Sequence, residues 1–267
     1  MKRIFLFNII LILVAMLTAC NLIDEPNNYT NNAYTSTSNA SSSKSKTVAS
    51  PSSLVEITIK NDNAENENFS YEIEYPIISN LQNASKQTEI NSKIKKQVYD
   101  FMAKIKSLSG AQSKSEYFMP YSVTTDFETK TLSPQIISML GSFSQDTGGA
   151  HPNYSIVPYN IDAISGKFLS LEDIFVPDFD YKTIINKEIK NQIKKDTSGN
   201  IYFQEKNLRF ASISPMQQFY IENGQLFIQF DTYEIAPYST GAPSFFIRND
   251  ILIEGVKNQY KSIFINQ

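Results

Sequence analysis

One apolar stripe, in the stretch 85–108, constrains the fold of this chain more than any other feature of its sequence. The stripe consists of Ile90, Ile94, Val98, Phe101, Ile105 and Leu108, separated by three or four residues. This spacing predicts a long amphipathic helix that ends near Gly110. Because only one side of such a helix is apolar, that side has to be buried against another element. We therefore expect the helix to pack on a sheet.

Strand patterns stand on both sides of this helix in the sequence. Two stretches before it, 54–60 and 69–75, alternate apolar with polar or acidic residues, as strands with one solvated face do. Pro76 is expected to end the second of these strands. Further strands are predicted at 122–127, 135–143, 154–164 and 245–253.

The dipeptide Asn223-Gly224 separates two runs of strand-forming residues, 219–222 and 225–230. Asn and Gly accept the positive φ angles of a type I′ turn, so the two runs should form a β-hairpin. A shorter amphipathic helix is predicted at 181–195. Two principal helices among many strands, without regular alternation, indicate an α+β fold with mainly antiparallel sheets and two closely associated subdomains.

The first twenty residues have the order of a secretory signal. Lys2 and Arg3 precede an apolar run over 4–17, which is short for a membrane span of about 20 residues. The run closes with Leu-Thr-Ala-Cys, which resembles the lipobox of bacterial lipoproteins. We therefore predict a signal peptide over 1–19 and acylation of Cys20, which would anchor the chain to a membrane on its extracytoplasmic side, in the bacterial cell envelope. The alternatives are an ordinary secretory peptide and an uncleaved signal anchor.

A flexible tether is predicted after the lipid attachment site, over 20–53. Between 26 and 53, Ser, Thr and Asn supply 18 of 28 residues. So little apolar surface cannot offset the entropy lost on ordering the chain. A random coil of this length spans roughly 30 Å. The tether should hold the folded part near the membrane while leaving it free to swing.

Composition restricts the chemistry that the chain can perform. One Cys and one His exclude an internal disulfide, a CxxC site and a histidine-rich metal centre. With 24 Lys+Arg against 27 Asp+Glu, the chain lacks the net basic charge of a dedicated nucleic-acid binder. We therefore expect no metal, no cofactor and no nucleic-acid partner.

Lysines gather on the two predicted helices, with seven in 85–114 and five in 181–195. The favoured interpretation is that these lysines cover solvated helix exteriors, and the alternative is a face that binds a polyanion.

Several short motifs follow one another after the first helix. They are Gly148-Gly149-Ala150-His151-Pro152-Asn153, Asn160-Ile161-Asp162, Ser165-Gly166-Lys167, Leu169 to Phe175, and Tyr233-Glu234-Ile235-Ala236-Pro237-Tyr238 ending in Gly241. In this order they resemble a bacterial family of two adjacent domains of unknown function. That family includes the extracytoplasmic part of the anti-sigma factor RsiV and the region ahead of the catalytic domain in the peptidoglycan deacetylase PdaC. The likeness covers nearly all of 54–267.

The resemblance implies a compact α+β ectodomain with a first domain over 54–164 and a second, RsiV-like domain over 165–267. In RsiV the ectodomain binds lysozyme by entering the substrate cleft of the enzyme. We expect no sigma-binding segment and no deacetylase domain in this chain. The function expected is therefore that of a free-standing, non-catalytic lipoprotein that binds peptidoglycan or a lysozyme-like muramidase.

The candidate ligand-binding residues come from the first and last motifs. They are Gly148, Gly149, His151, Pro152, Asn153, Tyr233, Glu234, Pro237, Tyr238 and Gly241. Aromatic residues in or near these motifs could stack on sugars, anchor a protein partner or belong to the core; they are Tyr154, Tyr159, Tyr233, Tyr238, Phe245 and Phe246.

The alternative function is a cell-wall glycan hydrolase that uses Glu234 and His151. As a general base, His151 would need an orienting carboxylate and a nucleophile. The available partners are Glu234, Asp146 and Asp162 for the first role, and Ser144 and Ser239 for the second. A glycosidase would instead pair Glu234 with Asp231 or Asp162. The favoured interpretation is architectural, with His151 hydrogen-bonded across to the 233–241 loop.

Overall fold

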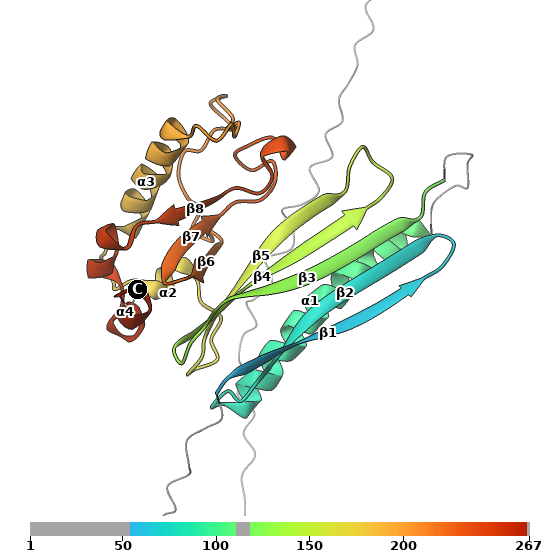
Figure 1. The fold of residues 1–267 in the computed structure, drawn as a ribbon, viewed down its shortest axis with the longest axis horizontal. Helices are drawn as coiled ribbons and strands as arrows, with labels where there is room; N and C mark the ends of the chain where they lie inside the picture. Colours follow the sequence, from blue (N-terminus) through green and yellow to red (C-terminus); the bar gives the residue numbers. More distant parts are fainter. Residues whose placement is uncertain (1–53, 111–117, 266–267) are drawn as a thin grey trace, which may run out of the picture. The chain divides into compact units, whose positions relative to one another are not determined.

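Two sheets, of five and three strands, organise the residues that the computed structural model describes, which are 54–110 and 118–265 (Figure 1). The larger sheet contains, in spatial order, β1 (Glu56–Glu65), β2 (Phe69–Ser79), β3 (Tyr121–Leu132), β4 (Ile136–Asp146) and β5 (Asn153–Asp162). The smaller contains β6 (Phe219–Glu222), β7 (Gln225–Gln229) and β8 (Ser244–Ile247). The predicted signal peptide, Cys20 and the tether lie outside the described residues.

The helix α1 (Ala84–Ser109) covers one face of the larger sheet, as its apolar stripe predicts (Figure 1). The prediction was wrong for Leu108, which lies in the last turn and is 51% exposed. Asn83 caps the helix, because its side chain accepts a hydrogen bond from the Lys86 N–H at 3.0 Å. Since α1 crosses the sheet between β2 and β3, these two strands run parallel. The larger sheet is therefore mixed, whereas every other strand pair in the described residues is antiparallel.

Pro76 does not end β2, and that prediction was wrong. The strand continues to Ser79, with Pro76 opposite Ile59 of β1. Pairing between β2 and β3 stops at Ile73, so Pro76 lies where β2 has a single neighbour. A missing N–H is tolerated in such an edge position.

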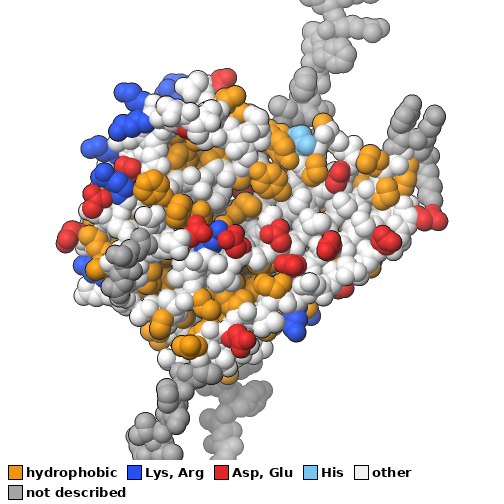
Figure 2. All heavy atoms as spheres, in the orientation of Figure 1, with side chains coloured by type: hydrophobic (Ala, Val, Ile, Leu, Met, Phe, Trp, Pro, Cys, Tyr) orange, Lys and Arg blue, Asp and Glu red, His pale blue; other side chains and the backbone are white. Residues whose placement is uncertain are grey.

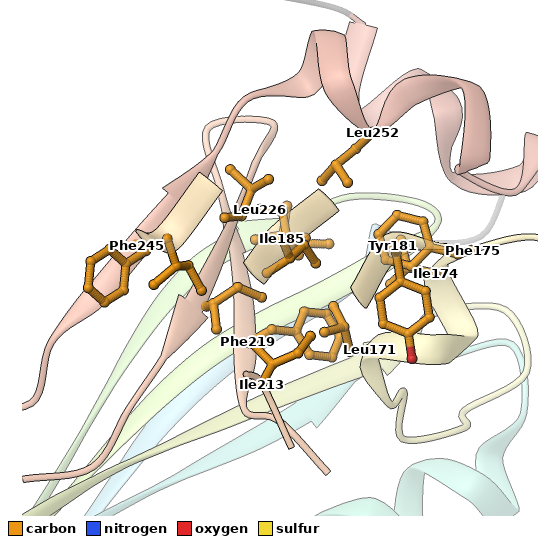
Figure 3. Packing of buried hydrophobic residues seen from close by; sticks show 14 of the residues in the cluster. Leu171, Ile174, Phe175, Tyr181, Ile185, Ile213, Phe219, Leu226, Phe245 and Leu252 are labelled. Atoms are coloured by element: carbon orange, nitrogen blue, oxygen red, sulfur yellow. The ribbon is translucent and has the colours of Figure 1, made fainter. Parts of the chain in front are cut away.

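The smaller sheet is built around the predicted hairpin. Asn223 and Gly224 have φ angles of +48° and +66°, which confirms the turn between β6 and β7. The helix α3 (Tyr181–Lys195) occupies the predicted residues and is capped by Asp180. Each sheet has its own hydrophobic core, and the apolar side of α3 packs into the core of the smaller sheet (Figure 3). This core includes Ile174, Tyr181, Ile185, Phe219, Leu226, Phe245 and Leu252.

The last predicted strand is shorter than expected, since β8 ends at Ile247. The Asn249 side chain donates hydrogen bonds to the carbonyls of Gly224 and Phe264, both at 2.8 Å, which draws the chain out of the sheet. Two 3-10 turns follow, η2 (Asn249–Ile251) and η3 (Ile253–Gly255), and then α4 (Asn258–Ile265). None of the described helices is long and apolar enough to cross a bilayer.

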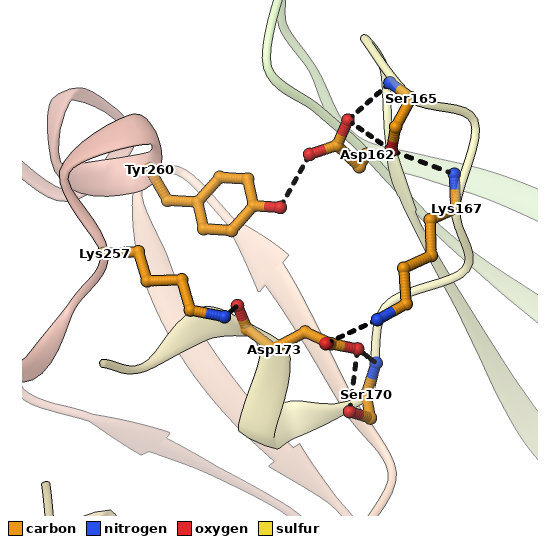
Figure 4. Close-up of polar contacts among 7 residues, drawn as sticks. All are labelled: Asp162, Ser165, Lys167, Ser170, Asp173, Lys257 and Tyr260. Carbon is orange, nitrogen blue, oxygen red and sulfur yellow. Dashed lines mark hydrogen bonds and ion pairs between the residues drawn. The ribbon is translucent and has the colours of Figure 1, made fainter. Parts of the chain in front are cut away.

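Polar contacts tie α4 to the segment that follows β5 (Figure 4). Asp162 accepts hydrogen bonds from the Ser165 N–H at 2.7 Å and from the Tyr260 hydroxyl at 2.6 Å. The short helix α2 (Leu171–Ile174) begins with a capping box in which Ser170 and Asp173 bond each other. The motif Asn160-Ile161-Asp162 therefore ends β5, and the motifs at 165–175 form turns and caps.

A buried polar seam joins the two sheets. Ser138 donates to the Asn160 Oδ1 at 2.8 Å, and the Asn160 Nδ2 donates to the carbonyl of Phe219 at 2.6 Å. Ser138 also accepts from the Ile221 N–H at 2.9 Å. These side chains of the larger sheet satisfy backbone groups of β6, so the association of the two sheets is specific. The domain boundary between 164 and 165 stays a prediction.

Replacing Asn160 should destabilise the protein. Asn160→Ala leaves the carbonyl of Phe219 and the hydroxyl of Ser138 without these partners in a site that solvent does not reach. We expect the free energy of unfolding to fall by about 1–3 kcal/mol. Urea denaturation of the fragment 49–267, a compact unit that holds every described element, measures this change. Thr124→Ala, on an exposed position of β3, is the control, and a similar small loss in both variants would contradict the role of the seam.

Candidate functional site

The two motifs that hold the candidate ligand-binding residues form the turn after β4 and the loop after β7. These two segments meet at the start of β5. The His151 Nε2 lies 3.2 Å from the Tyr233 hydroxyl, and the ring of His151 stacks on that of Tyr238 with centroids 3.7 Å apart. Tyr238 donates to the Pro152 carbonyl at 2.8 Å, and Tyr154 meets Tyr238 edge-on. We call His151, Tyr154, Tyr233 and Tyr238 the histidine–tyrosine cluster.

Both ring nitrogens of His151 have partners. The Nδ1 lies 3.0 Å from the carbonyl oxygen of Pro152, which can only accept a hydrogen bond, so in the neutral ring this nitrogen carries the proton. The Nε2 then accepts from the Tyr233 hydroxyl. This is the contact that the architectural interpretation expects, and it leaves no ring nitrogen of a neutral His151 free to take a proton from a substrate.

The other candidate residues shape the two segments. Gly241 has a φ of +80°, and a Cβ there would lie 2.9 Å from the Tyr154 hydroxyl, so glycine allows the close approach. Gly148 also has a positive φ and donates its N–H to Asp146 at 2.9 Å. The remaining members are Gly149 in the same turn, Asn153 at the first position of β5, and Pro237 ahead of the 3-10 turn η1 (Tyr238–Thr240).

Of the predicted catalytic groupings, only the pair of Glu234 and Asp231 comes together. In the described part of the chain, no hydrogen bond or ion pair joins His151 to a carboxylate or to either candidate serine, Ser144 or Ser239. Glu234 accepts from the Asp231 N–H at 2.9 Å. Asp162 lies at the far end of β5, roughly 26 Å from Tyr154 at about 3.3 Å per residue. A glycosidase pair of Glu234 and Asp162 is therefore excluded by distance.

One pair of acids keeps an unusual environment. Burial raises the pKa of the Asp231 carboxyl, and its Oδ1 is buried without a hydrogen-bond partner. Partial burial, with the Asp231 carboxylate nearby, also raises the pKa of Glu234. Perturbed acids of this kind are common at functional sites. This pair is the observation that favours the hydrolase alternative.

The candidate aromatic residues divide between core and surface. Tyr159 and Phe245 are buried in the two cores. Phe246 is exposed on the smaller sheet, where it neighbours Phe227. Tyr233 is 50% exposed and has a φ of +66°, a backbone strain that is often retained for function.

Sequence reasoning missed the surface beside this cluster, which is the face of the larger sheet opposite α1. A row of cross-strand neighbours runs on this face from Glu72 through Thr124 and Ser144 to Tyr154. The same face carries a group of acids that we call the acidic face; it consists of Glu65, Glu72, Glu74, Asp126, Glu128 and Asp146. Figure 2 shows acidic side chains along this uncovered surface.

The acidic face has little compensating charge. Lys130 at its end is bonded to Glu128 at 2.7 Å and to Glu222 at 3.0 Å. Alternating acids in the strand sequences were a visible signal of a solvated face. Which acids would become neighbours depends on strand order, and the sequence did not reveal that order.

Comparisons with known proteins find two family matches in the same order as the two sheets. Residues 62–154 match the family described as deacetylase PdaC, and residues 172–250 match the family described as protein of unknown function DUF3298. The chain is thus similar to one family over its first part and to the other over its second part. The predicted family resemblance is confirmed.

Two similar proteins come from Bacillus subtilis. The anti-sigma-V factor RsiV is 27% identical over 194 residues, which are 70% of this chain and 66% of RsiV. The peptidoglycan-N-acetylmuramic acid deacetylase PdaC is 24% identical over 202 residues, which are 72% of this chain and 40% of PdaC. The chain therefore spans only part of the length of either relative.

Solved structures of the DUF3298 family confirm the α+β fold. A member from Bacteroides fragilis superposes with a TM-score of 0.60 and 15% identity, covering 80% of this chain and 98% of that one. A member from Pseudomonas aeruginosa gives a TM-score of 0.56 and 16% identity, covering 79% and 97%. At this level of identity the likeness concerns the fold alone.

The partly buried acid Asp231 should make stability fall as pH rises. A raised pKa means that the folded chain holds this proton more tightly than the unfolded chain, so the stabilising contribution is full below about pH 3.9 and is lost as pH rises through the folded pKa. Asp231→Asn removes this pH-dependent loss of stability, because the amide does not ionise. We expect a gain of about 1 kcal/mol near pH 7, because burying a charged carboxylate costs more than burying a neutral amide, and a smaller gain near pH 3.5, where more of the carboxyl is protonated.

Urea denaturation of the fragment 49–267 at both pH values measures this difference. Asp126→Asn is the matched control, because Asp126 is an exposed carboxylate of β3 and should change stability little at either pH. An equal effect of Asp231→Asn at both pH values would show that ionisation of this carboxyl does not destabilise the fold.

Proposed function

We propose that this chain is a non-catalytic, lipid-anchored protein of the bacterial cell envelope whose ligand is a cationic, lysozyme-like muramidase. Peptidoglycan is the other ligand class that the family resemblance implies. The observation that carries the proposal is that the histidine–tyrosine cluster and the acidic face lie on one surface, joined by the row from Glu72 to Tyr154.

The acidic face suits the first approach of a cationic ligand, and the histidine–tyrosine cluster suits close contact with it. Uncompensated carboxylates attract a cationic protein over a distance and increase its rate of association, most strongly at low salt. Tyrosine rings bury large areas at a small entropic cost, and tyrosines are common at the centres of interfaces. The rings of Tyr233 and Tyr238 are held by the contacts with His151 and Pro152, so they need little reordering on binding.

Charge favours the muramidase over the cell-wall polymer. A face of six carboxylates offers nothing to the carboxylates of peptide stems, whereas it complements a basic enzyme. The family resemblance implies a lysozyme-binding ectodomain, as in RsiV. The similarity to RsiV covers 70% of this chain. Both considerations support the same ligand.

Binding to lysozyme tests this proposal. Calorimetric titration of the fragment 49–267 should give a saturable heat with lysozyme, and Tyr238→Ala should weaken the affinity at least tenfold, as loss of a central aromatic anchor does. Phe246→Ala is the control, since this exposed ring lies outside the cluster. Reversing charge with Glu72→Lys and Asp126→Lys should weaken binding more at low salt than at high salt.

Three outcomes would contradict the proposal. Heat with muropeptides and none with lysozyme would make peptidoglycan the ligand. No heat with either at high micromolar concentration would remove the binding function. The third outcome is turnover of peptidoglycan that disappears in Glu234→Gln, which would establish the alternative, a cell-wall glycan hydrolase using Glu234 and His151.

Lipid anchoring has its own test. Mass spectrometry of the protein extracted from bacterial membranes should find a chain that begins at Cys20 and carries acyl groups on that residue. Cys20→Ala should leave the protein unacylated and release it from the membrane fraction. An unmodified Cys20 in the membrane-bound protein would contradict this part of the proposal.

A further inference from the structure

The outward side of α3 carries four exposed lysines, Lys187, Lys190, Lys194 and Lys195. Within the described residues, none of them forms an ion pair. The single carboxylate of the helix, Glu188, instead accepts a hydrogen bond from Gln192 at 3.0 Å. Figure 2 shows the resulting concentration of basic side chains at the upper left, over α3. We call these four residues the lysine face.

The lysines of α1 differ, because most of them have a partner. Lys86 pairs with Glu89 at 2.7 Å, and Lys96 pairs with Asp100. Two others lie over aromatic rings, Lys93 at 4.6 Å from the centroid of Phe168 and Lys95 at 5.1 Å from that of Tyr75. The helix α1 thus neutralises or covers much of its charge within the fold, whereas α3 does not.

The fold gains little from the lysine face. Like charges three and four residues apart on a helix repel one another, as Lys187, Lys190 and Lys194 do. The helix dipole stabilises cations in the last turn, which accounts for Lys194 and Lys195. It does not account for Lys187 and Lys190, which lie further from the helix end. An external anion would offset the repulsion among all four.

An exposed aliphatic side chain follows α3 in the sequence, six residues after Lys195, where its backbone bonds the Thr240 side chain. The Asp196 side chain closes a turn after α3 by bonding Ser198 and Asn200, and Ile201 follows with 59% of its surface exposed. An isoleucine beside lysines gains free energy at the interface of a bilayer, where acyl chains lie beneath the headgroups. A soluble polyanion offers it no such gain.

We infer that the lysine face, together with Ile201, docks on the surface of a bilayer that contains anionic lipids. The acidic face belongs to the larger sheet and not to α3, and it is repelled by the same lipids, so docking through α3 leaves it available to a ligand. The inference agrees with anchoring at Cys20 but does not depend on it, because an unacylated fragment should bind as well.

Vesicle binding tests the inference. The fragment 49–267 should sediment with vesicles that contain about one third phosphatidylglycerol and stay in solution with vesicles of phosphatidylcholine alone. The triple variant Lys187→Gln, Lys190→Gln, Lys194→Gln should lower the partition coefficient about fivefold for each lysine, which is on the order of 100-fold in total. Ile201→Ser should weaken vesicle binding several-fold and leave binding to inorganic polyphosphate unchanged.

A matched control removes the same charge from the other helix. Lys96→Gln, Lys104→Gln and Lys106→Gln change three lysines of α1, and this variant should keep most of the vesicle binding. Equal losses in the two triple variants, or equal sedimentation with both kinds of vesicle, would overturn the inference. Tight binding to polyphosphate with none to vesicles would show that the lysine face serves a soluble anion. Circular dichroism of each variant establishes that it is folded.

Discussion

The position of the candidate site depends on hydrogen bonds that are buried between two sheets. Asn160 and Ser138 on the larger sheet satisfy backbone groups of β6, an edge strand that would otherwise leave them unpaired. This fixes the smaller sheet at one end of the larger one. The long loop after β7 can then reach back to the start of β5, where Tyr233 and Tyr238 meet His151. Tyr233 and His151, which are 82 residues apart in the sequence, can thus meet because the buried polar seam holds the two sheets together at the opposite end of β5.

The second constraint is that a sheet has two faces and α1 covers only one. Burial of its apolar stripe against β2, β3 and β4 stabilises the larger sheet and leaves the other face to solvent. Charged side chains cost little there, and the acids of β2 and β3 gather on that face together with Tyr154. The cationic side chains lie mainly on the helices. The fold therefore separates charge, with the acidic face on the larger sheet and the lysine face on α3.

The parts of the fold that follow from local signals could be predicted from the sequence. The helical spacing of α1 and α3 and the Asn223-Gly224 turn need no distant partner, and their positions are confirmed. The path of β2 past Pro76 could not be predicted, since it depends on where β3 stops pairing. The same holds for the site: the sequence singled out His151 and Tyr238, but only the order of the strands brings the acidic face beside them. The partner of Asp162, Tyr260, lies 98 residues away and has no local signal.

We propose that the histidine–tyrosine cluster and the acidic face act together as one binding surface. Hydrogen–deuterium exchange of the fragment 49–267, with and without lysozyme, tests this claim most directly because it locates the contact. We expect slower exchange in the turn after β4, in the 231–241 loop and along β2 and β3, and no change in α3. Protection confined to α3, or unchanged exchange throughout at saturating lysozyme, would contradict it.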